Sequence, residues 1–329
     1  MSEVTIDTGP LKGAMLQSKG GAEVGFFGGI PYAQPPVGEL RWRAPQAPDS
    51  WVECRDATTY GPSCPQFIHG EGGFRDTITR ALGIETPDVE ALTYDEDCLF
   101  LNVFSPDINS EANLPVLFWV HGGAHRFGSS TNYPGQELAA KGVVVVTINY
   151  RLGPLGFLSH PELSAEGCQG NQGLLDTVFA LQWVQRNISQ FGGDAANVTV
   201  FGESAGGHST CAMFTSPLCK GLVHRAIAQS GMGAQATQLL DKPGAVPISA
   251  HDTGEMLGEV IGCEKGKDQL QAMRGIDVDE LISKTAAFPI PGVIIDGYCQ
   301  PENPLSMIRN GQHNDIPLMI GSNADEGSA

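Results

Sequence analysis

Ten residues, 198–207, constrain this chain more than any other stretch of it. They read V-T-V-F-G-E-S-A-G-G: an apolar strand, a G-x-S-x-G pattern, and the start of helix-compatible sequence. In this arrangement the serine, Ser204, stands on a sharp strand-to-helix turn with its hydroxyl exposed to a base. The flanking glycines permit the turn because they carry no Cβ. The stretch therefore predicts a sheet-and-helix fold that presents a serine nucleophile.

A G-x-S-x-G match on its own says little, because three fixed positions recur by chance in a chain with 42 glycines. The match becomes informative because of the strand and helix patterns that surround it. Apolar segments at 98–104, 114–120 and 143–149 are typical of strands, and residues 173–187 place Leu and Val at the three- and four-residue spacing of a helix. Strands and helices that alternate in this way predict an α/β fold, with a mainly parallel sheet covered by helices.

The two ends of the chain follow other patterns. Residues 1–60 have short apolar runs separated by Gly and Pro, which predicts small antiparallel strands and turns. Beyond residue 231 the sequence is more polar, and its periodicity changes again. We predict helices there at 251–261 and 267–273 and strands at 293–295 and 318–320.

The charge and cysteine content exclude several kinds of partner. The chain has 37 acidic and 19 basic residues, a net charge of −18, so we expect neither nucleic acid nor an anionic membrane as a partner. The eight cysteines include no C-x-x-C pair, and we expect no metal site. The first residues lack the basic start and apolar run of a signal peptide. Two compartments stay open: the cytoplasm, or the exterior if a leader is not included.

Residues 117–124, L-F-W-V-H-G-G-A, form a predicted strand that runs into a His-Gly-Gly loop. Acyl transfer needs backbone N–H donors for the oxyanion, and residues without side chains bring such donors close to a substrate. Gly122 and Gly123 supply two of these donors, and Ala205, directly after the serine, supplies the third. We therefore predict an oxyanion hole formed by these three residues.

Six stretches of the chain occur together in a specific order. They are G-G-I-P-Y-A (28–33), E-D-C-L-F-L-N-V (96–103), H-G-G-A (121–124), N-Q-G-L-L-D (171–176), F-G-G-D (191–194) and F-G-E-S-A-G-G (201–207). In this order they resemble the type-B carboxylesterases, the cholinesterase and carboxylesterase family of α/β-hydrolases. The resemblance implies a single α/β-hydrolase domain over residues 1–329, with a mainly parallel central sheet, helices on both faces and a small N-terminal antiparallel sheet. It also implies that carboxylic esters are cleaved through an acyl-enzyme on Ser204, without a cofactor.

The resemblance extends to the acid of a catalytic triad. The family has a glutamate in a D-E-G stretch after a later strand, and Glu326 matches it, so Glu326 would orient a histidine base. In the family this histidine follows the acid by a long interval, whereas all eight histidines here precede Glu326 and none matches the motif. We therefore expect a C-terminally incomplete domain whose histidine comes from a C-terminal polypeptide.

Two ion pairs of the family have counterparts in this sequence. The resemblance pairs Arg43 with Glu96 and Arg151 with Asp176. Each pair could equally be a solvent-exposed coincidence, and a buried charge is tolerated only when an opposite charge lies beside it. We predict both pairs as internal supports of the fold, without a role in catalysis.

Four further residues are assigned by the resemblance alone. Cys64 and Cys98 match a disulfide of the family, and two free thiols in a reducing compartment are the alternative. Glu203, beside the nucleophile, matches a carboxylate that lies in the family's active site. His125 stands where the family has an aromatic residue, so it would make the pocket wall more polar or, more plainly, face the solvent. We treat Glu203 and His125 as residues that line the active site.

Few residues bear on the substrate. No Trp lies between Cys64 and Cys98, where cholinesterases bind a quaternary ammonium by cation–π contact, so we do not expect choline esters. Residues 286–291 fall near the family's acyl pocket and are small or Pro, which favours a roomy pocket. We predict a small-molecule ester as the substrate. The alternatives are a non-catalytic adhesion or binding protein on the same fold, and a lipase or thioesterase.

Overall fold

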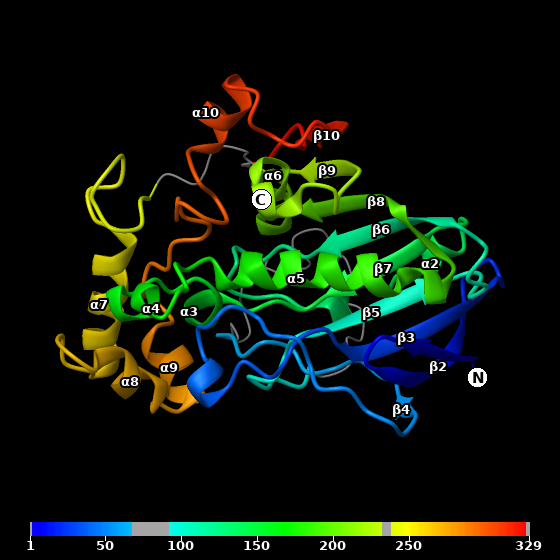
Figure 1. Cartoon of the computed structure of the whole chain (residues 1–329), viewed down its shortest axis with the longest axis horizontal. Coiled ribbons are helices and arrows are strands. Elements are labelled where there is room, and N and C mark those ends of the chain that lie inside the picture. The colour runs from blue at the N-terminus through cyan, green and yellow to red at the C-terminus, as the bar shows by residue number, and fades with distance from the viewer. Residues whose placement is uncertain (1, 68–91, 232–237, 327–329) are drawn as a thin grey trace.

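A computed structural model describes residues 2–67, 92–231 and 238–326 of the chain. Its centre is a sheet that has ten strands within these residues, in the order β1-β2-β3-β5-β7-β6-β8-β9-β10, with β4 paired to β2 (Figure 1). The strands are β1 (Ser2–Ile6), β2 (Gly9–Gln17), β3 (Glu23–Pro31), β4 (Arg55–Asp56), β5 (Phe100–Ser105), β6 (Leu114–Val120), β7 (Val144–Ile148), β8 (Gly193–Glu203), β9 (Arg225–Gln229) and β10 (Leu318–Gly321).

The helices lie between and after these strands. They are α2 (Gln136–Ala139), α3 (Gly153–Gly156), α4 (Pro161–Ala165), α5 (Gln172–Asn187), α6 (Ala205–Thr215), α7 (Ala250–Ile261), α8 (Gln269–Arg274), α9 (Val278–Lys284) and α10 (Pro304–Arg309). Short 3₁₀ turns occur at Gly38–Leu40, Ser130–Asn132, Ile188–Phe191 and Pro217–Cys219. Within the described ranges, no helix combines the length and the apolar character needed to cross a membrane.

The sheet has a parallel and an antiparallel half. Strands β7, β6, β8, β9 and β10 pair in parallel, as the predicted βα alternation requires. Strands β1, β2, β3, β5 and β7 pair antiparallel. The α/β-hydrolase prediction is therefore confirmed, and the antiparallel strands predicted near the N-terminus continue the edge of the same sheet.

Helices cover both faces of the sheet. Successive residues of a strand point to opposite faces, so one strand can contribute side chains to an apolar core on each face. On β7, Val144 and Val146 enter the larger apolar core, together with Leu174 and Leu181 of α5. The intervening residue, Val145, enters a second and smaller core. This smaller core also contains residues of β3, β5 and α2, so α5 and α2 lie on opposite faces of the sheet (Figure 1).

Two stretches of the chain have a secondary structure that the sequence did not predict. Residues 293–295 are not a strand: Ile295 forms an isolated bridge to Leu239, and the Ile294 N–H donates to the Asn171 side chain at 2.9 Å. The Ile294 N–H is therefore bonded to the Asn171 side chain and is not available to a neighbouring strand. The sequence analysis also missed β2, whose glycines and proline resemble loop sequence although alternate residues such as Leu11 are fully buried.

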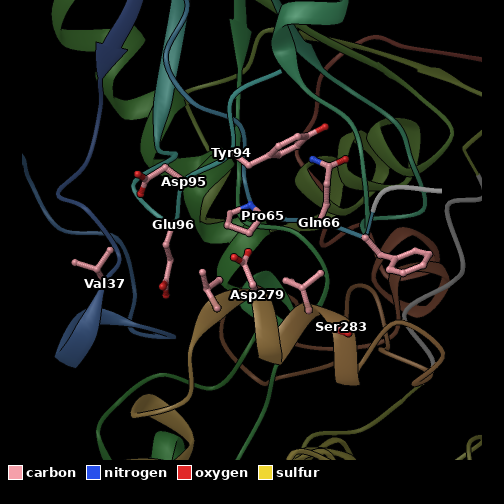
Figure 2. Close-up of a pocket in the computed structure, with 11 residues that line it drawn as sticks. Val37, Pro65, Gln66, Tyr94, Asp95, Glu96, Asp279 and Ser283 are labelled. Atoms are coloured by element: carbon pink, nitrogen blue, oxygen red, sulfur yellow. The ribbon is translucent and has the colours of Figure 1, made fainter. Parts of the chain in front are cut away.

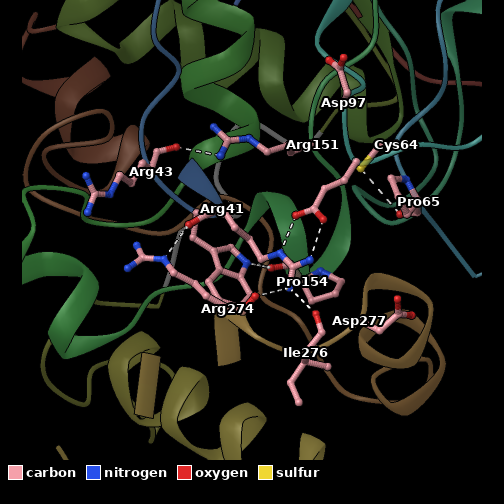
Figure 3. A network of polar contacts seen from close by, with 12 residues as sticks. Arg41, Arg43, Cys64, Pro65, Asp97, Arg151, Pro154, Arg274, Ile276 and Asp277 are labelled. Atoms are coloured by element: carbon pink, nitrogen blue, oxygen red, sulfur yellow. Dashed lines mark hydrogen bonds and ion pairs between the residues drawn. The ribbon is translucent and has the colours of Figure 1, made fainter. Parts of the chain in front are cut away.

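The Arg151–Asp176 pair is confirmed as a buried ion pair (Figure 3 shows Arg151 within its network). Arg151 Nη2 lies 2.6 Å from Asp176 Oδ1 and Arg151 Nε lies 2.8 Å from Oδ2. The two side chains are 2% and 0% exposed. Two parallel bonds of this kind satisfy both charges in the same plane, which offsets the cost of removing them from water.

The predicted Arg43–Glu96 pair is wrong. Glu96 is held instead by Arg41, whose Nε and Nη2 lie 2.5 and 2.6 Å from the carboxylate oxygens. Arg41 also donates to the carbonyl of Ile276 at 2.6 Å, a contact between segments far apart in the sequence (Figure 3). Arg43 Nε lies 3.2 Å from Glu166. Sequence spacing cannot distinguish two arginines two residues apart when their partners come from distant segments.

Replacing the buried carboxylate at position 176 should destabilise the fold strongly. In Asp176→Asn the shape is kept but Arg151 is left buried without its counter-charge, and we expect the free energy of unfolding to fall by about 3–5 kcal/mol. Urea unfolding followed by tryptophan fluorescence measures this change. The matched control is Glu280→Gln, which removes the exposed pair Glu280–Lys284. It should cost less than about 0.5 kcal/mol, and equal losses in both variants would contradict the argument.

Candidate active site

The carboxyl ends of β6, β8, β9 and β10 meet at one edge of the sheet (Figure 1). The last three strands end level with one another, because Glu203 pairs with Gln229 and Gln229 pairs with Gly321. Ligand sites of open parallel sheets form at this edge, where loops from several strands converge. Ser204 follows β8 and Glu326 follows β10, so two residues far apart in the sequence leave the sheet at the same edge.

Ser204 has the strained backbone that the motif predicts. Its φ and ψ are 53° and −118°, a region that L-residues rarely occupy, and its N–H donates to the Gln229 carbonyl at 2.9 Å. The glycines are required by close packing. A Cβ at Gly206 would lie 1.9 Å from the Val120 carbonyl oxygen, and one at Gly207 would lie 2.6 Å from the Gln229 oxygen. Helix α6 can begin here only because its first turn has no side chains on the faces toward β6 and β9.

The His-Gly-Gly loop lies directly against the nucleophile. A Cβ at Gly122 would be 2.7 Å from the Glu203 carbonyl oxygen and 3.3 Å from Ser204 Cβ. Gly123 has φ +110°, which an L side chain rarely adopts. The N–H groups of Gly122, Gly123 and Ala205 donate to no acceptor within the residues that the structure describes. N–H donors without an acceptor beside a candidate nucleophile are what an oxyanion hole requires.

Glu326 is held in place by two hydrogen bonds. Its Oε1 accepts from the Ser230 hydroxyl and from the Asn323 N–H, the latter at 2.8 Å. These two bonds, the Ser230 bond foremost, lower the pKa of the Glu326 carboxyl, so it is ionised at neutral pH. Ser230 directly follows β9, the strand between β8 and β10, and it is not among the site residues predicted from the sequence. The sequence signal that could have identified it is its position at the end of a predicted parallel strand.

Glu203 belongs to the same electrostatic environment. Burial raises the pKa of its carboxyl, and the negative charge of Glu326 raises it further. A Cβ at Gly122 would lie 2.9 Å from Glu203 Oε2, so the Glu203 side chain sits beside the His-Gly-Gly loop. The two carboxylates are therefore near enough to influence one another at the strand ends.

No histidine in the described parts of the chain hydrogen-bonds to the Ser204 hydroxyl, and His69 lies outside those parts. Six of the others are engaged elsewhere: His121 with the Gly122 carbonyl, His125 with Ser209, His160 with Gln269, His224 with the Val198 N–H, His251 with Ser164, and His313 stacked on Phe214. His208 lies one helical turn after Ser204, with Nε2 buried and without a partner among the described residues. Burial lowers its pKa.

His125 does not face the solvent. Its side chain is buried, 6% exposed, and Nε2 forms a 2.9 Å hydrogen bond with Ser209 Oγ on α6. The ring also packs on Phe157, with 4.7 Å between centroids. Burial, with a smaller contribution from His208, lowers the pKa of His125 to about 3, so the ring is neutral at physiological pH. No local sequence pattern indicates that α6 places the Ser209 hydroxyl beside this buried ring.

Cys64 and Cys98 are free thiols in the structure, and the disulfide implied by the resemblance is not formed. Both are buried, and the Cys64 sulfur accepts a hydrogen bond from the Leu152 N–H at 3.3 Å. The hydrogen bond with Cys64 and burial together hold the pKa of Cys98 far above its ordinary value. The two residues are thus buried as thiols.

Other parts of the described chain offer little for a metal or a ligand. Among the described residues, no cluster of three or more His, Cys, Asp or Glu has the arrangement of a metal site. A cavity of about 580 Å³ lies beside α9, with Asp95, Glu96 and Asp279 among its lining residues (Figure 2). Neither Ser204 nor Glu326 lines it, and Glu96 is already bound to Arg41. This cavity is separate from the predicted catalytic residues.

Comparison with known proteins finds esterases that are similar to this chain. The chain is 40% identical to the para-nitrobenzyl esterase of Bacillus subtilis, an alignment that covers 98% of this chain and 63% of that protein. It is 41% identical to the fumonisin B1 esterase of Sphingopyxis macrogoltabida, over 93% of this chain and 54% of the relative. The chain therefore spans somewhat more than half the length of these relatives.

A solved structure agrees with the sequence relatives. A thermophilic para-nitrobenzyl esterase superposes with a TM-score of 0.82 at 38% identity, and the match covers 98% of this chain and 63% of the solved one. The model of a single family, described as the carboxylesterase family, matches residues 1–329. The fold, the strained serine and the match over residues 1–329 all agree. This chain therefore belongs to the carboxylesterase family.

Proposed function

We propose that the protein hydrolyses carboxylic esters through an acyl-enzyme on Ser204. The Ser204 oxygen attacks the ester carbonyl while a histidine takes its proton, and the oxyanion is held by the N–H groups of Gly122, Gly123 and Ala205. The same histidine returns the proton to the departing alcohol. Water then attacks the acyl group and releases the acid. Glu326 orients the histidine and stabilises its charged form.

One observation carries this proposal: three unused N–H donors surround a serine whose backbone is strained. Strain of this kind costs about 1–3 kcal/mol and persists where the surrounding structure enforces it, typically at functional sites. Here the enforcing contacts are those of Gly206 and Gly207 with β6 and β9. The retention of serine, donors and acid together argues against a non-catalytic binding protein on this fold.

We further propose that the histidine comes from polypeptide outside residues 1–329, which completes with them a single α/β-hydrolase domain. Two strand spacings separate the ends of β8 and β10, about 10 Å, which leaves room for an imidazole between Ser204 and Glu326. Strand β10 also exposes apolar side chains, with Met319 66% and Ile320 57% exposed. An apolar strand of this kind normally packs under further structure.

The substrate class follows from the site and the relatives. A serine nucleophile with an oxyanion hole acts on activated carbonyl groups, of which esters are the commonest. The relatives named above are esterases of a para-nitrobenzyl ester and of fumonisin B1. We propose a small-molecule carboxylic ester as the substrate of this protein.

Free imidazole should serve as the base that the described residues do not supply to Ser204. For residues 1–329 we expect slow labelling of Ser204 by a fluorophosphonate, accelerated at least about tenfold by saturating imidazole because general-base catalysis contributes about 10²–10⁴-fold. Intact-mass spectrometry measures the adduct, which should be missing in Ser204→Ala. The His208→Ala variant should respond like the wild type. Fast labelling without imidazole that is lost in His208→Ala would assign the base to His208, and a folded protein that never labels would remove the hydrolase proposal.

The carboxylate at position 326 should hold the added imidazole. Replacing it in Glu326→Gln removes a charge-assisted hydrogen bond, so the half-saturating imidazole concentration should rise roughly tenfold. Because the pKa of Glu326 is lowered, it stays ionised throughout the pH range in which imidazole titrates, and the rescue should rise with pH only as imidazole loses its proton. Asp325→Asn, a carboxylate one residue away, is the matched control. The same imidazole dependence in Glu326→Gln and wild type would exclude Glu326 as the acid.

A further inference from the structure

The oxyanion hole is assembled from two separate elements. Gly122 and Gly123 belong to the loop after β6, whereas Ala205 is the first residue of α6. Sheet pairing aligns Val120 with Gly202, but it ends before either set of donors begins. The positions of the donors relative to one another therefore depend on contacts beyond the sheet. Displacements of about 1 Å at such a site can cost on the order of 10²-fold in rate.

The loop after β6 is not stable by itself. Ala124 and His125 have φ values of 54° and 56°, the left-handed region that non-glycine residues seldom adopt. Two successive residues in this region must be held by their surroundings. On the outer side, the Arg126 guanidinium donates to the carbonyls of Phe288 and Ala286 at 2.8 and 2.7 Å. These bonds fasten the loop to residues 285–288, but not to the helix that bears the third donor.

The His125 ring makes the connection to that helix. Its Nε2 forms the 2.9 Å bond with Ser209 Oγ on α6. Ser209 lies one helical turn after Ala205, so this bond joins the loop to the turn of α6 that begins with the third donor. Behind the ring, the His125 carbonyl accepts from the Gly153 N–H at 2.6 Å.

We propose that His125 is a positioning residue, whose hydrogen bond to Ser209 of α6 sets the separation between Gly122 and Gly123 on one side of the oxyanion hole and Ala205 on the other. The proposal rests on the ester-hydrolase function proposed above. His125 does not touch the substrate and takes no proton. It acts through the placement of the three N–H donors, so its loss should slow the chemical step more than it weakens substrate binding.

A buried histidine that merely satisfies its own polarity would behave differently. The chain contains a partly buried pair for comparison: His251 Nε2 and Ser164 Oγ lie 2.8 Å apart, on helices away from the strand ends. Both pairs join a histidine to a serine hydroxyl on another element. Only the His125–Ser209 pair spans the two sides of the oxyanion hole.

The test is the kinetics of fluorophosphonate labelling at saturating imidazole, resolved into the maximal rate and the half-saturating inhibitor concentration. The phosphoryl oxygen of the reagent develops negative charge in the oxyanion hole, so the maximal rate reports the hole. His125→Phe keeps an aromatic ring of similar size and removes the hydrogen bond to Ser209. We expect its maximal rate to fall by about 10- to 100-fold, with the half-saturating concentration within about twofold of the wild type.

Ser209→Ala removes the same hydrogen bond by changing its other partner. It therefore tests the bond even if His125→Phe does not fold. It should lower the maximal rate in the same way, and the double variant should be no slower than His125→Phe alone, because both changes break one connection. His125→Gln, which keeps a donor near the Nε2 position, should recover part of the rate. His251→Phe should label at the wild-type rate.

The outcomes separate this proposal from the proposed function. Wild-type protein that does not label contradicts the ester-hydrolase function itself. Wild-type labelling together with unchanged maximal rates in His125→Phe and Ser209→Ala overturns the positioning role alone. Losses that simply add in the double variant, or an equal loss in His251→Phe, would show general destabilisation and would also overturn it.

Discussion

The contact on which the site depends is the approach of α6 to the ends of β6 and β9. At Gly206 a single added carbon would come within 1.9 Å of a β6 carbonyl oxygen. Backbone packing this close holds Ser204 in its strained conformation, because the turn cannot relax without separating helix from sheet. The same approach leaves the Ala205 N–H free at the start of the helix, where the helix dipole also favours negative charge.

The charged side chains that support the fold and those at the strand ends differ in how deeply they are buried. Arg151 and Asp176 are enclosed and satisfy each other, so they support the sheet without bearing on the reaction. Glu326 lies exposed at the strand ends, where the Ser230 and Asn323 bonds keep it ionised. A carboxylate in the first environment stabilises a fold, whereas in the second it is available to a partner that arrives at the site.

Much of this arrangement could be predicted from particular residues. The G-x-S-x-G stretch predicted the turn at Ser204, because only a serine flanked by side-chain-free residues suits a strand-to-helix turn with an exposed hydroxyl. Local periodicity located β6 and α5 to within a residue. It failed for β2 and for residues 293–295, where glycines and a side-chain hydrogen bond decide the backbone conformation. Arg43 was paired with Glu96 in place of Arg41 for a related reason: the partner carbonyl of Ile276 is more than two hundred residues away.

The sequence by itself predicted the candidate nucleophile, the glycine loop, the carboxylate and the sheet type, because these predictions depend on residue identity and short-range spacing. Only the tertiary structure decided which side chains meet. It buried His125 against Ser209 and gave Glu326 the Ser230 hydroxyl. It also left Cys64 and Cys98 as thiols in contact. Such contacts join segments that the linear order keeps apart, and they are set by the packing of helices and strand ends that no local pattern records.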